Sequence, residues 1–271
     1  MTEADTIALG ETLFALGTNN VGHLIELDYQ CTSSMGSSND CSPNPLFKQV
    51  DEASVLQLPI YQKLLALYDN YDPYVNVAED HTEQEHQEEL DFLQTVLDTD
   101  IMRAAYEFLV EKGAFTGTMD AFGTKLYEMW FRMYERGGKL SSSGFEHTFL
   151  GEIDGSKVGG FHNWFHWYKE EQAGNINYIG YWRTGDFGSN RGGGLEGTYT
   201  WQSVQKDYGS MFIGTAPELE LALYTSCLLT FPDAVCHVRL GGQDVYIQTW
   251  TQYDSDGTLM VGSSYPDFGQ S

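Results

Sequence analysis

The hydrophobic pattern of the chain changes once, at the Gly/Ser-rich run GGKLSSSG over residues 137–144. Before this run, apolar residues recur at the three- and four-residue spacing of amphipathic helices. This spacing predicts helices over residues 4–16, from Pro59 onward, 79–97, 100–112 and 118–136. After the run, β-branched and aromatic residues alternate or cluster as they do in strands. We expect strands over 147–153, 175–182, 198–204, 234–240 and 244–253, and helices over 162–171 and 216–229.

The change of pattern predicts an α+β fold, with a helical N-terminal part over residues 1–136 and a mixed part of antiparallel strands and helices over 137–271. The chain has 271 residues, of which 41% are hydrophobic, and this is ample for a sizeable core. No stretch approaches the ~18 to 20 apolar residues of a membrane helix. The first residues carry acids rather than the basic start of a signal peptide. We expect a soluble protein without membrane contact, either secreted or cytoplasmic.

The formal net charge of -25 argues against a general nucleic-acid binder, because phosphates are normally contacted by Lys and Arg. Most of the acidic excess falls in residues 1–136, however, and little of it in 137–213. A short single-stranded substrate held at a small local site therefore fits the charge pattern better than a long one. The strong acidity also favours a monomer.

The four cysteines, Cys31, Cys41, Cys227 and Cys236, show no CxxC spacing, so neither a zinc ribbon nor a thioredoxin motif is indicated. Each sequential pair brackets a short segment that a disulfide could close. In a reducing compartment all four would be free thiols, and the sequence leaves both states open.

The stretch from Gly144 to Trp164, GFEHTFLGEIDGSKVGGFHNW, contains two histidines, His147 and His162. Histidine is the side chain whose unperturbed pKa, about 6.5, suits proton transfer at neutral pH. Two such groups can act as an acid and a base. Paired histidines with nearby carboxylates also form metal sites, and a single histidine is commonly an ordinary core or surface residue.

The two-histidine stretch, Lys206, FIGTAPELELALYT over 212–225 and GSSYP over 262–266 resemble the EndoU family of poly(U)-specific, XendoU-like endoribonucleases. The segments DNY, EQEHQEELDFL and LYEMWF upstream fall in the family's order, so the resemblance covers nearly the whole chain. The histidine pattern is also similar to that of the uridylate-specific endoribonuclease of coronaviruses. The resemblance implies one EndoU-like unit that cuts single-stranded RNA at uridylates, leaving 2′,3′-cyclic phosphate and 5′-OH ends.

The resemblance also implies residue roles. His162 is expected as the base and His147 as the acid, although the sequence does not fix which is which. Lys206 would stabilise the charge on the phosphorane. The remaining expected site residues are Glu146 and Glu152, which would orient a histidine rather than bind metal, and Thr249, which matches the family's uridine-linked position. Trp250 follows it where relatives often carry tyrosine, and it would either contact uracil or belong to the core. From the residues alone, Gly160 would either let the backbone approach a phosphate or form a simple turn with Gly159.

The family's dependence on Mn²⁺ or Ca²⁺ implies a cation site. Carboxylates of the 79–97 helix with an acid from the preceding turn would supply the oxygen ligands that calcium prefers, and the expected ligands are Glu83, Glu85, Glu88 and Asp69. The same acids also suit a solvated helix face that begins with a Thr82–Glu85 capping box. His81 and His86 lie five residues apart, which is the wrong spacing for two zinc ligands on one helix face.

Two other functions remain open from the sequence. One is a catalytically silent RNA-binding or calcium-binding protein on the same fold, which the intact His147, His162 and Lys206 set disfavours. The other is a metal-dependent phosphodiesterase unrelated to RNA, which would not need a 2′-OH in its substrate.

Overall fold

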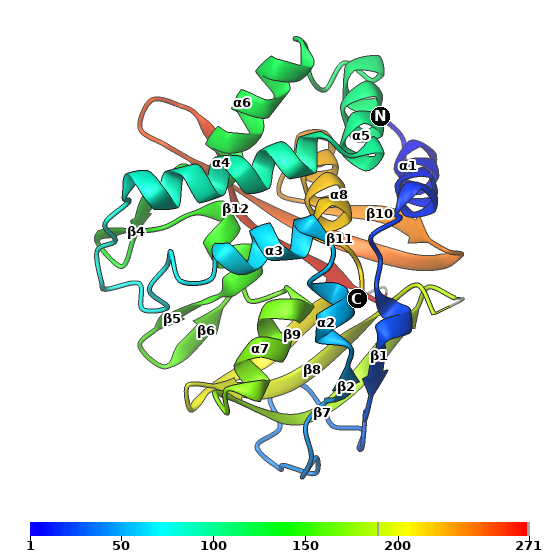
Figure 1. The fold of residues 1–271 in the computed structure, drawn as a ribbon, viewed down its shortest axis with the longest axis vertical. Coiled ribbons are helices and arrows are strands. Elements are labelled where there is room, and N and C mark those ends of the chain that lie inside the picture. Colours follow the sequence, from blue (N-terminus) through cyan, green and yellow to red (C-terminus); the bar gives the residue numbers. More distant parts are fainter. Residues whose placement is uncertain (189, 270–271) are drawn as a thin grey trace.

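The computed structural model describes residues 1–188 and 190–269, and it is an α+β protein of helices and antiparallel strands, as predicted (Figure 1). Among these residues, no helix combines the length and the apolar character that a membrane span needs. The helical elements are α1 (Glu3–Leu16), η1 (Gly22–Leu24), α2 (Glu52–Val55), α3 (Pro59–Ala66), α4 (Glu83–Leu97), α5 (Asp100–Glu111), α6 (Met119–Trp130), the π-helical turn η2 (Glu146–Leu150), α7 (Trp164–Gln172) and α8 (Pro217–Thr230).

Over the described residues, the strands form two three-stranded antiparallel sheets, ordered β7-β8-β9 and β10-β11-β12, and three two-stranded antiparallel pairs. Strand β12 of one large sheet contacts β9 of the other, so these two strands lie beside each other. The strands are β1 (Ile25–Leu27), β2 (Phe47–Val50), β3 (Tyr134–Arg136), β4 (Lys139–Ser142), β5 (Glu152–Asp154), β6 (Lys157–Gly159), β7 (Ile176–Asp186), β8 (Gly193–Trp201), β9 (Val204–Ile213), β10 (Val235–Leu240), β11 (Gln243–Tyr253) and β12 (Leu259–Asp267).

Helix α8 is the centre of the core. Every residue from Pro217 to Leu228 is buried, and the helix contacts α1, α3, α5, β11 and β12 (Figure 1). A helix that is buried on every face must be covered on all sides, and elements of both sequence halves cover this one. Trp130, at the end of α6, donates its indole N–H to Thr225 on α8 at 2.9 Å. One continuous hydrophobic core therefore joins residues 1–136 to the rest of the described chain.

The N-terminal helices begin where local signals place them. At the start of α4 the backbone N–H of Glu85 donates to the Thr82 hydroxyl at 3.2 Å, and the Thr82 N–H donates to the Glu85 carboxylate at 2.6 Å. This is the predicted capping box. The helix therefore begins at Glu83 rather than at residue 79, and His81 lies outside it.

Three further expected elements differ from the structure. The helix expected over 118–136 ends at Trp130, because 134–136 pairs instead with residues 139–142 in the β3–β4 hairpin. Residues 147–150 belong to the η2 turn rather than to a strand, and only 152–154 is extended. The strand expected over 198–204 is split at Gln202 and Ser203, whose positive φ values of 50° and 66° turn the chain into β9.

Candidate active site

His147 lies on the η2 turn, with 7% of its surface exposed. Its Nδ1 is 2.6 Å from the Oε2 atom of Glu152 on β5, and the Arg136 guanidinium lies 3.2 Å from the same oxygen. Burial lowers the pKa of His147, and the hydrogen bond to Glu152 offsets part of this effect. The carboxylate therefore fixes the ring orientation and holds a proton on Nδ1, so that Nε2 is the atom left for proton transfer.

His162 is held in a different way. Its Nδ1 is 2.6 Å from the backbone carbonyl of Ser210, and 4% of its surface is exposed. Because a carbonyl oxygen only accepts, Nδ1 carries the proton and Nε2 presents a lone pair. Burial, followed by the nearby Lys206 charge, lowers the pKa of His162 well below its usual value. A neutral imidazole with a free lone pair is the form that a general base needs.

The glycine pair before His162 permits close packing over the His147 backbone. Gly160 has φ +57°, and a Cβ at this position would lie 1.5 Å from the His147 carbonyl oxygen. A Cβ on Gly159 would lie 2.9 Å from Cε1 of the His147 ring. The Phe161 N–H donates to the His147 carbonyl at 3.0 Å, so the two histidine segments are hydrogen-bonded to each other. The structure thus gives Gly160 a packing role independent of any phosphate.

Lys206 lies on β9 and donates to the Val158 carbonyl at 3.1 Å, next to the glycine pair. Burial lowers its pKa to about 8. Its charge also lowers the pKa of both His147 and His162, which shows that the three side chains share one electrostatic environment. The structure therefore gathers the three predicted catalytic residues at one place.

A groove of about 530 Å³ adjoins this place. Its aromatic wall includes Tyr265 on β12 and Tyr208 on β9, whose ring centroids are 6.1 Å apart. The Tyr265 ring also stacks on the His162 ring, with centroids 5.0 Å apart and planes at 21°. Tyr265 therefore connects the groove to the proposed base. Met35, Val235, Tyr246, Gln248, Asp267 and Gly269 complete the lining.

Tyr265 lies within the GSSYP segment, but the sequence alone indicates no role for Tyr265 or for Tyr208. Tyr208 follows Lys206 by two residues, but the pairing of β8 with β9 shifts register in this stretch, so the two-residue period of a regular strand does not place the two side chains on one face. The contact between Tyr265 and His162 joins residues 103 positions apart, and no local pattern predicts it.

Thr249 and Trp250, the expected uracil contacts, lie on β11 away from the groove lining. Thr249 is buried and donates its hydroxyl to the Phe231 carbonyl at 3.0 Å. Trp250 is 48% exposed. The neighbouring Gln248 points into the groove instead, because successive strand residues face opposite sides.

The two supporting acids differ in their surroundings. Glu152 contacts His147 directly, whereas neither carboxylate oxygen of the buried Glu146 has a hydrogen-bond partner among the described residues. Burial, followed by the negative charges of Glu152 and Glu79, raises the pKa of Glu146 well above its usual value. Burial also raises the pKa of Glu79 to about 8. Burial and mutual repulsion therefore favour the protonated forms of Glu146 and Glu79, whereas the lowered pKa of Glu152 makes it the ionised partner of His147.

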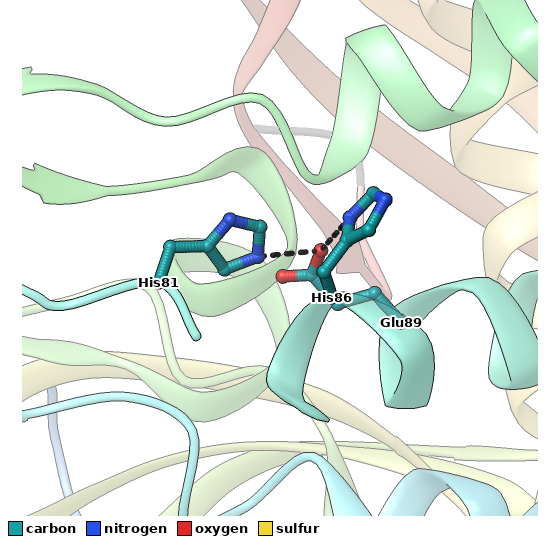
Figure 2. Close-up of side chains that lie close together, drawn as sticks. All are labelled: His81, His86 and Glu89. Atoms are coloured by element: carbon teal, nitrogen blue, oxygen red, sulfur yellow. Dashed lines mark hydrogen bonds and ion pairs between the residues drawn. The ribbon is translucent and has the colours of Figure 1, made fainter. Parts of the chain in front are cut away.

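The expected cation ligands are not all brought together. Asp69 and Glu85 line one shallow hollow of about 350 Å³ with Asp72, Glu79 and Asp80. Glu83 is exposed outside it, and Glu88 accepts a hydrogen bond from Gln84 at 2.9 Å. Within the described part of the chain, the compact group of metal-ligating side chains is instead His81, His86 and Glu89 (Figure 2). The five-residue spacing does not keep the two rings apart, because His81 precedes the helix and the two histidines therefore need not share a helix face.

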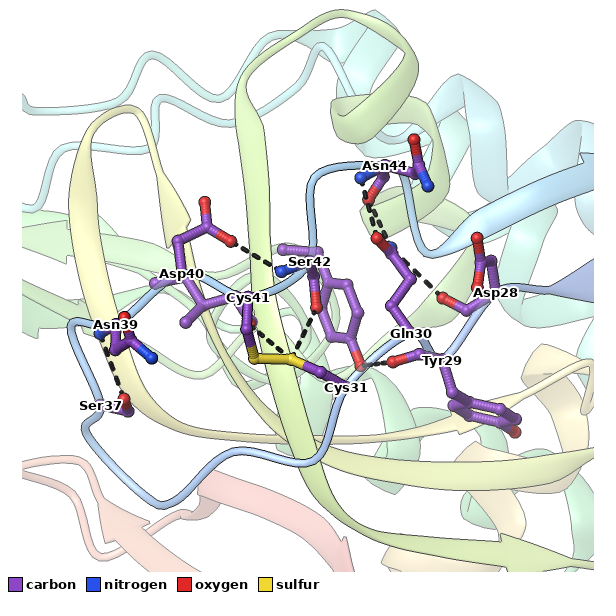
Figure 3. The surroundings of a disulfide bond; sticks show 12 residues. Asp28, Tyr29, Gln30, Cys31, Ser37, Asn39, Asp40, Cys41, Ser42 and Asn44 are labelled. Carbon is purple, nitrogen blue, oxygen red and sulfur yellow. Dashed lines mark hydrogen bonds between the residues drawn. A yellow bond between two sulfur atoms is a disulfide. The ribbon is translucent and has the colours of Figure 1, made fainter.

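Both cysteine pairs form disulfides, Cys31–Cys41 and Cys227–Cys236. The first closes a loop that crosses β7, where the Ser42 hydroxyl and the Ile179 carbonyl lie beside the sulfur atoms (Figure 3). Within this loop the Gly36 N–H donates to the Asp207 carbonyl on β9 at 3.1 Å. The loop therefore carries the neighbouring Met35 to the rim of the aromatic groove.

Known proteins resemble this chain over almost its full length. The sequence profile of the family described as Endoribonuclease XendoU matches residues 5–266. Uridylate-specific endoribonuclease D of Xenopus laevis is 36% identical over 97% of this chain and 88% of its own length. Uridylate-specific endoribonuclease EndoU of Drosophila melanogaster is 34% identical over 98% of this chain and 83% of its own length.

A solved structure gives the same result in three dimensions. The structure of XendoU, described as a splicing independent snoRNA processing endoribonuclease, superposes with a TM-score of 0.81 at 31% sequence identity. The superposition covers 98% of this chain and 97% of that one.

Proposed function

The chain belongs to the Endoribonuclease XendoU family, and we propose that it cuts single-stranded RNA at uridylates through His147, His162 and Lys206. The observation that carries this proposal is that the two imidazoles have different hydrogen-bond partners. Nδ1 of His162 bonds to a neutral backbone carbonyl, and the pKa of His162 is strongly lowered. Nδ1 of His147 bonds to an ionised carboxylate, which offsets part of the fall in pKa that burial causes. Unequal surroundings of this kind assign one group as base and the other as acid.

The reaction that fits these groups is a transesterification. Nε2 of His162 takes the proton of the ribose 2′-OH, whose oxygen attacks the adjacent phosphorus. The imidazolium of His147 donates its Nε2 proton to the leaving 5′ oxygen as the P–O bond breaks. The products are a 2′,3′-cyclic phosphate and a 5′-OH, and each proton transfer contributes about 10² to 10⁴-fold to the rate.

Lys206 acts on the charge of the transition state. A half-buried ammonium next to both histidines stabilises the negative charge that develops on the phosphorane oxygens, and the low-dielectric surroundings strengthen this interaction. Because the pKa of Lys206 is about 8, its ammonium group is mostly protonated at neutral pH.

Uridine binds in the aromatic groove. The relatives' names describe uridylate specificity, and single-stranded bases are usually bound by stacking and by hydrogen bonds to their edges. Tyr265 and Tyr208 supply aromatic faces, and Gln248 supplies a polar group in the same groove. In this arrangement Thr249 does not touch the base, because its side chain is buried and bonds to the Phe231 carbonyl.

A divalent cation, Mn²⁺ or Ca²⁺, stimulates the reaction in this proposal. The oxygen-rich hollow that contains Asp69 and Glu85 has the donor chemistry that such hard cations prefer. Asp72 and Asp80 would complete the set, in place of Glu83 and Glu88. A bound cation would supply positive charge beside an acidic surface and so help a polyanionic RNA to approach.

Two disulfides favour an oxidising compartment over the cytosol, so we propose that the protein works outside the reducing cytosol. The monomeric state stays a prediction from net charge.

The proposal is tested with an oligonucleotide that contains one uridine among other bases. We expect a single cut at the uridine, with a 2′,3′-cyclic phosphate end, that is faster with Mn²⁺ or Ca²⁺ than with EDTA. Cutting at all bases would contradict uridylate choice, and equal rates in EDTA would contradict stimulation by a cation. Binding of the oligonucleotide without cleavage would favour the silent RNA-binding alternative.

A further inference from the structure

A second group of histidines lies at the start of α4, outside the proposed active site. His81 and His86 have 35% and 47% of their side chains exposed, whereas Glu89 between them is fully buried. Figure 2 shows both rings turned toward the Glu89 carboxylate. Solvent thus reaches the two imidazoles, and the carboxylate lies at the bottom of the group.

The local fold brings these three residues together. His86 and Glu89 are three residues apart on α4, so they lie on one helix face. His81 precedes the Thr82 N-cap, where the chain turns back over the first turn of the helix. Nε2 of His81 is 3.0 Å from Oε2 of Glu89, and Nδ1 of His86 is 3.9 Å from the same oxygen.

The buried Glu89 carboxylate has no strong cationic partner. Within the described residues its ion-pair partners are these two histidines, and neither a lysine nor an arginine lies within 4.0 Å. Tyr71 donates its hydroxyl to Oε1 at 2.7 Å, and Tyr127 donates to Oε2 at 2.9 Å. A buried carboxylate with hydrogen bonds but no full positive charge is costly, and a divalent cation would supply that charge.

We propose that His81, His86 and Glu89 form a binding site for a zinc-class divalent ion. Two imidazoles and one carboxylate are a common zinc ligand set, with water as the fourth ligand. Bonds of about 2.0–2.2 Å in a tetrahedron place ligand atoms roughly 3.3 Å apart. The two separations of 3.0 and 3.9 Å bracket this value, and all three ligand atoms lie within 4.8 Å of one another.

The surroundings of the ligands fit this assignment. Hydrogen bonds from Tyr71 and Tyr127 orient the carboxylate, as outer partners commonly do for metal ligands. The Tyr127 hydroxyl also lies 2.9 Å from Nδ1 of His86, a contact that the bound ion would replace. Calcium prefers an all-oxygen set, which distinguishes this site from the acidic hollow around Asp69.

Such an ion would tie the segment before α4 to the helix itself. This segment also carries Glu79, whose carboxylate contributes to the raised pKa of Glu146 beside His147. The zinc site does not depend on the proposed nuclease activity, because its ligands are separate from His147, His162 and Lys206.

Binding is measured on the full chain after chelator treatment and dialysis, by titration with Zn²⁺ alone. The double variant His81→Gln/His86→Gln is compared with wild type and with His23→Gln, an exposed histidine on another element. We expect wild type and His23→Gln to bind one Zn²⁺ more than the double variant. Any Zn²⁺ held by His147 or His162 remains in all three proteins and cancels in this comparison.

Each single variant, His81→Gln or His86→Gln, is expected to weaken that binding by at least about 100-fold, since loss of an outer partner alone typically costs about 10–100-fold. Zn²⁺ should raise the melting temperature of wild type and of His23→Gln but not of the double variant, and excess Ca²⁺ should not displace the ion. Equal Zn²⁺ stoichiometry in wild type and the double variant would overturn the proposal. Displacement by Ca²⁺ would overturn it as well.

Discussion

Nδ1 of His147 lies 2.6 Å from a carboxylate oxygen of Glu152, five residues further along the chain. Burial opposes the ionisation of Glu152, but the hydrogen bond from His147 and the Arg136 charge together hold its pKa below its usual value. The ionised carboxylate in turn raises the pKa of His147 against the effect of burial. The pair therefore limits the fall in the His147 pKa that burial causes, and so retains more of the protonated imidazole that an acid catalyst needs.

The substitution Glu152→Gln should lower kcat by about 10²-fold, because an acid catalyst is worth that much or more when it is protonated. Without the carboxylate the pKa of His147 falls further, so the protonated form is lost at a lower pH. The alkaline limb of the kcat profile should therefore move to lower pH. Asp154→Asn, an exposed acid on the same strand, is the control. An unchanged alkaline limb in Glu152→Gln would refute this role.

The substitution Gly160→Ala should displace the His147 backbone. The new Cβ would lie 1.5 Å from the His147 carbonyl oxygen at a φ of +57°, and we expect a loss of about 2–4 kcal/mol in unfolding free energy. Activity should fall as well. Gly155→Ala has a φ of +58° with nothing within 4 Å of its Cβ, so it should cost only the backbone strain of about 1–2 kcal/mol. Denaturant titration of both variants measures the difference, and equal losses would mean that the contact with His147 is unimportant.

Lys206 should limit activity at high pH. Its pKa of about 8 means that the ammonium is present below pH 8 and is lost as the pH rises above it. Arginine remains charged throughout this range. The ratio of kcat/KM for Lys206→Arg to that of wild type should therefore be constant below pH 7 and rise above pH 8. A ratio that stays flat to pH 10 would show that the charge of Lys206 does not matter.

Tyr265 should affect both base binding and the position of His162. The substitution Tyr265→Ala removes a ring that stacks on His162 and lines the groove, and loss of stacking costs roughly 1–3 kcal/mol for each base. We expect KM for a uridine oligonucleotide to rise at least about 5-fold and kcat to fall. Tyr265→Phe, which keeps the ring, should restore most of both. Tyr253→Ala, at an exposed tyrosine on β11, should leave both unchanged.

Reduction of the disulfides should lower stability. The Cys227–Cys236 bond links the end of α8 to β10, and both residues are buried. Replacing both cysteines with serine should cost about 2–3 kcal/mol of unfolding free energy in the loop-entropy account. The Cys31–Cys41 bond closes a loop of similar length at the groove, so its double-serine variant should additionally raise KM. A variant of Cys31 and Cys41 with unchanged KM would show that the loop does not position Met35.

Local signals in the sequence predict local structure well. Thr82 and Glu85 form the expected capping box, and the apolar stripe of 118–130 forms α6. The expected helix runs on to 136 because nothing local marks its end at Trp130. The β8–β9 hairpin was missed because Gln202 and Ser203 make its turn instead of the Asn-Gly or Asp-Gly pair typical of such turns.

In the candidate site, too, local features could be predicted from the sequence and tertiary contacts could not. His147, His162 and Lys206 were identified by resemblance, and the structure brings them together. The partner of each histidine was harder to predict. Glu152 is five residues from His147 and was among the candidates, whereas Ser210 contributes only a backbone carbonyl, which any residue could supply. Tyr265 reaches His162 only through the contact between β9 and β12, a tertiary arrangement that periodicity does not encode.

The central claim is that His162 removes a proton from the ribose 2′-OH. The most direct test is single-turnover cleavage of an oligonucleotide with one uridine, compared with the same oligonucleotide carrying 2′-deoxyuridine there, by wild type and His162→Ala. The account predicts a 2′,3′-cyclic phosphate from wild type on uridine, no cutting of the 2′-deoxyuridine substrate, and at least a ~10²-fold slower reaction for His162→Ala. Cleavage of the 2′-deoxyuridine substrate, or an equal rate for His162→Ala, would contradict it.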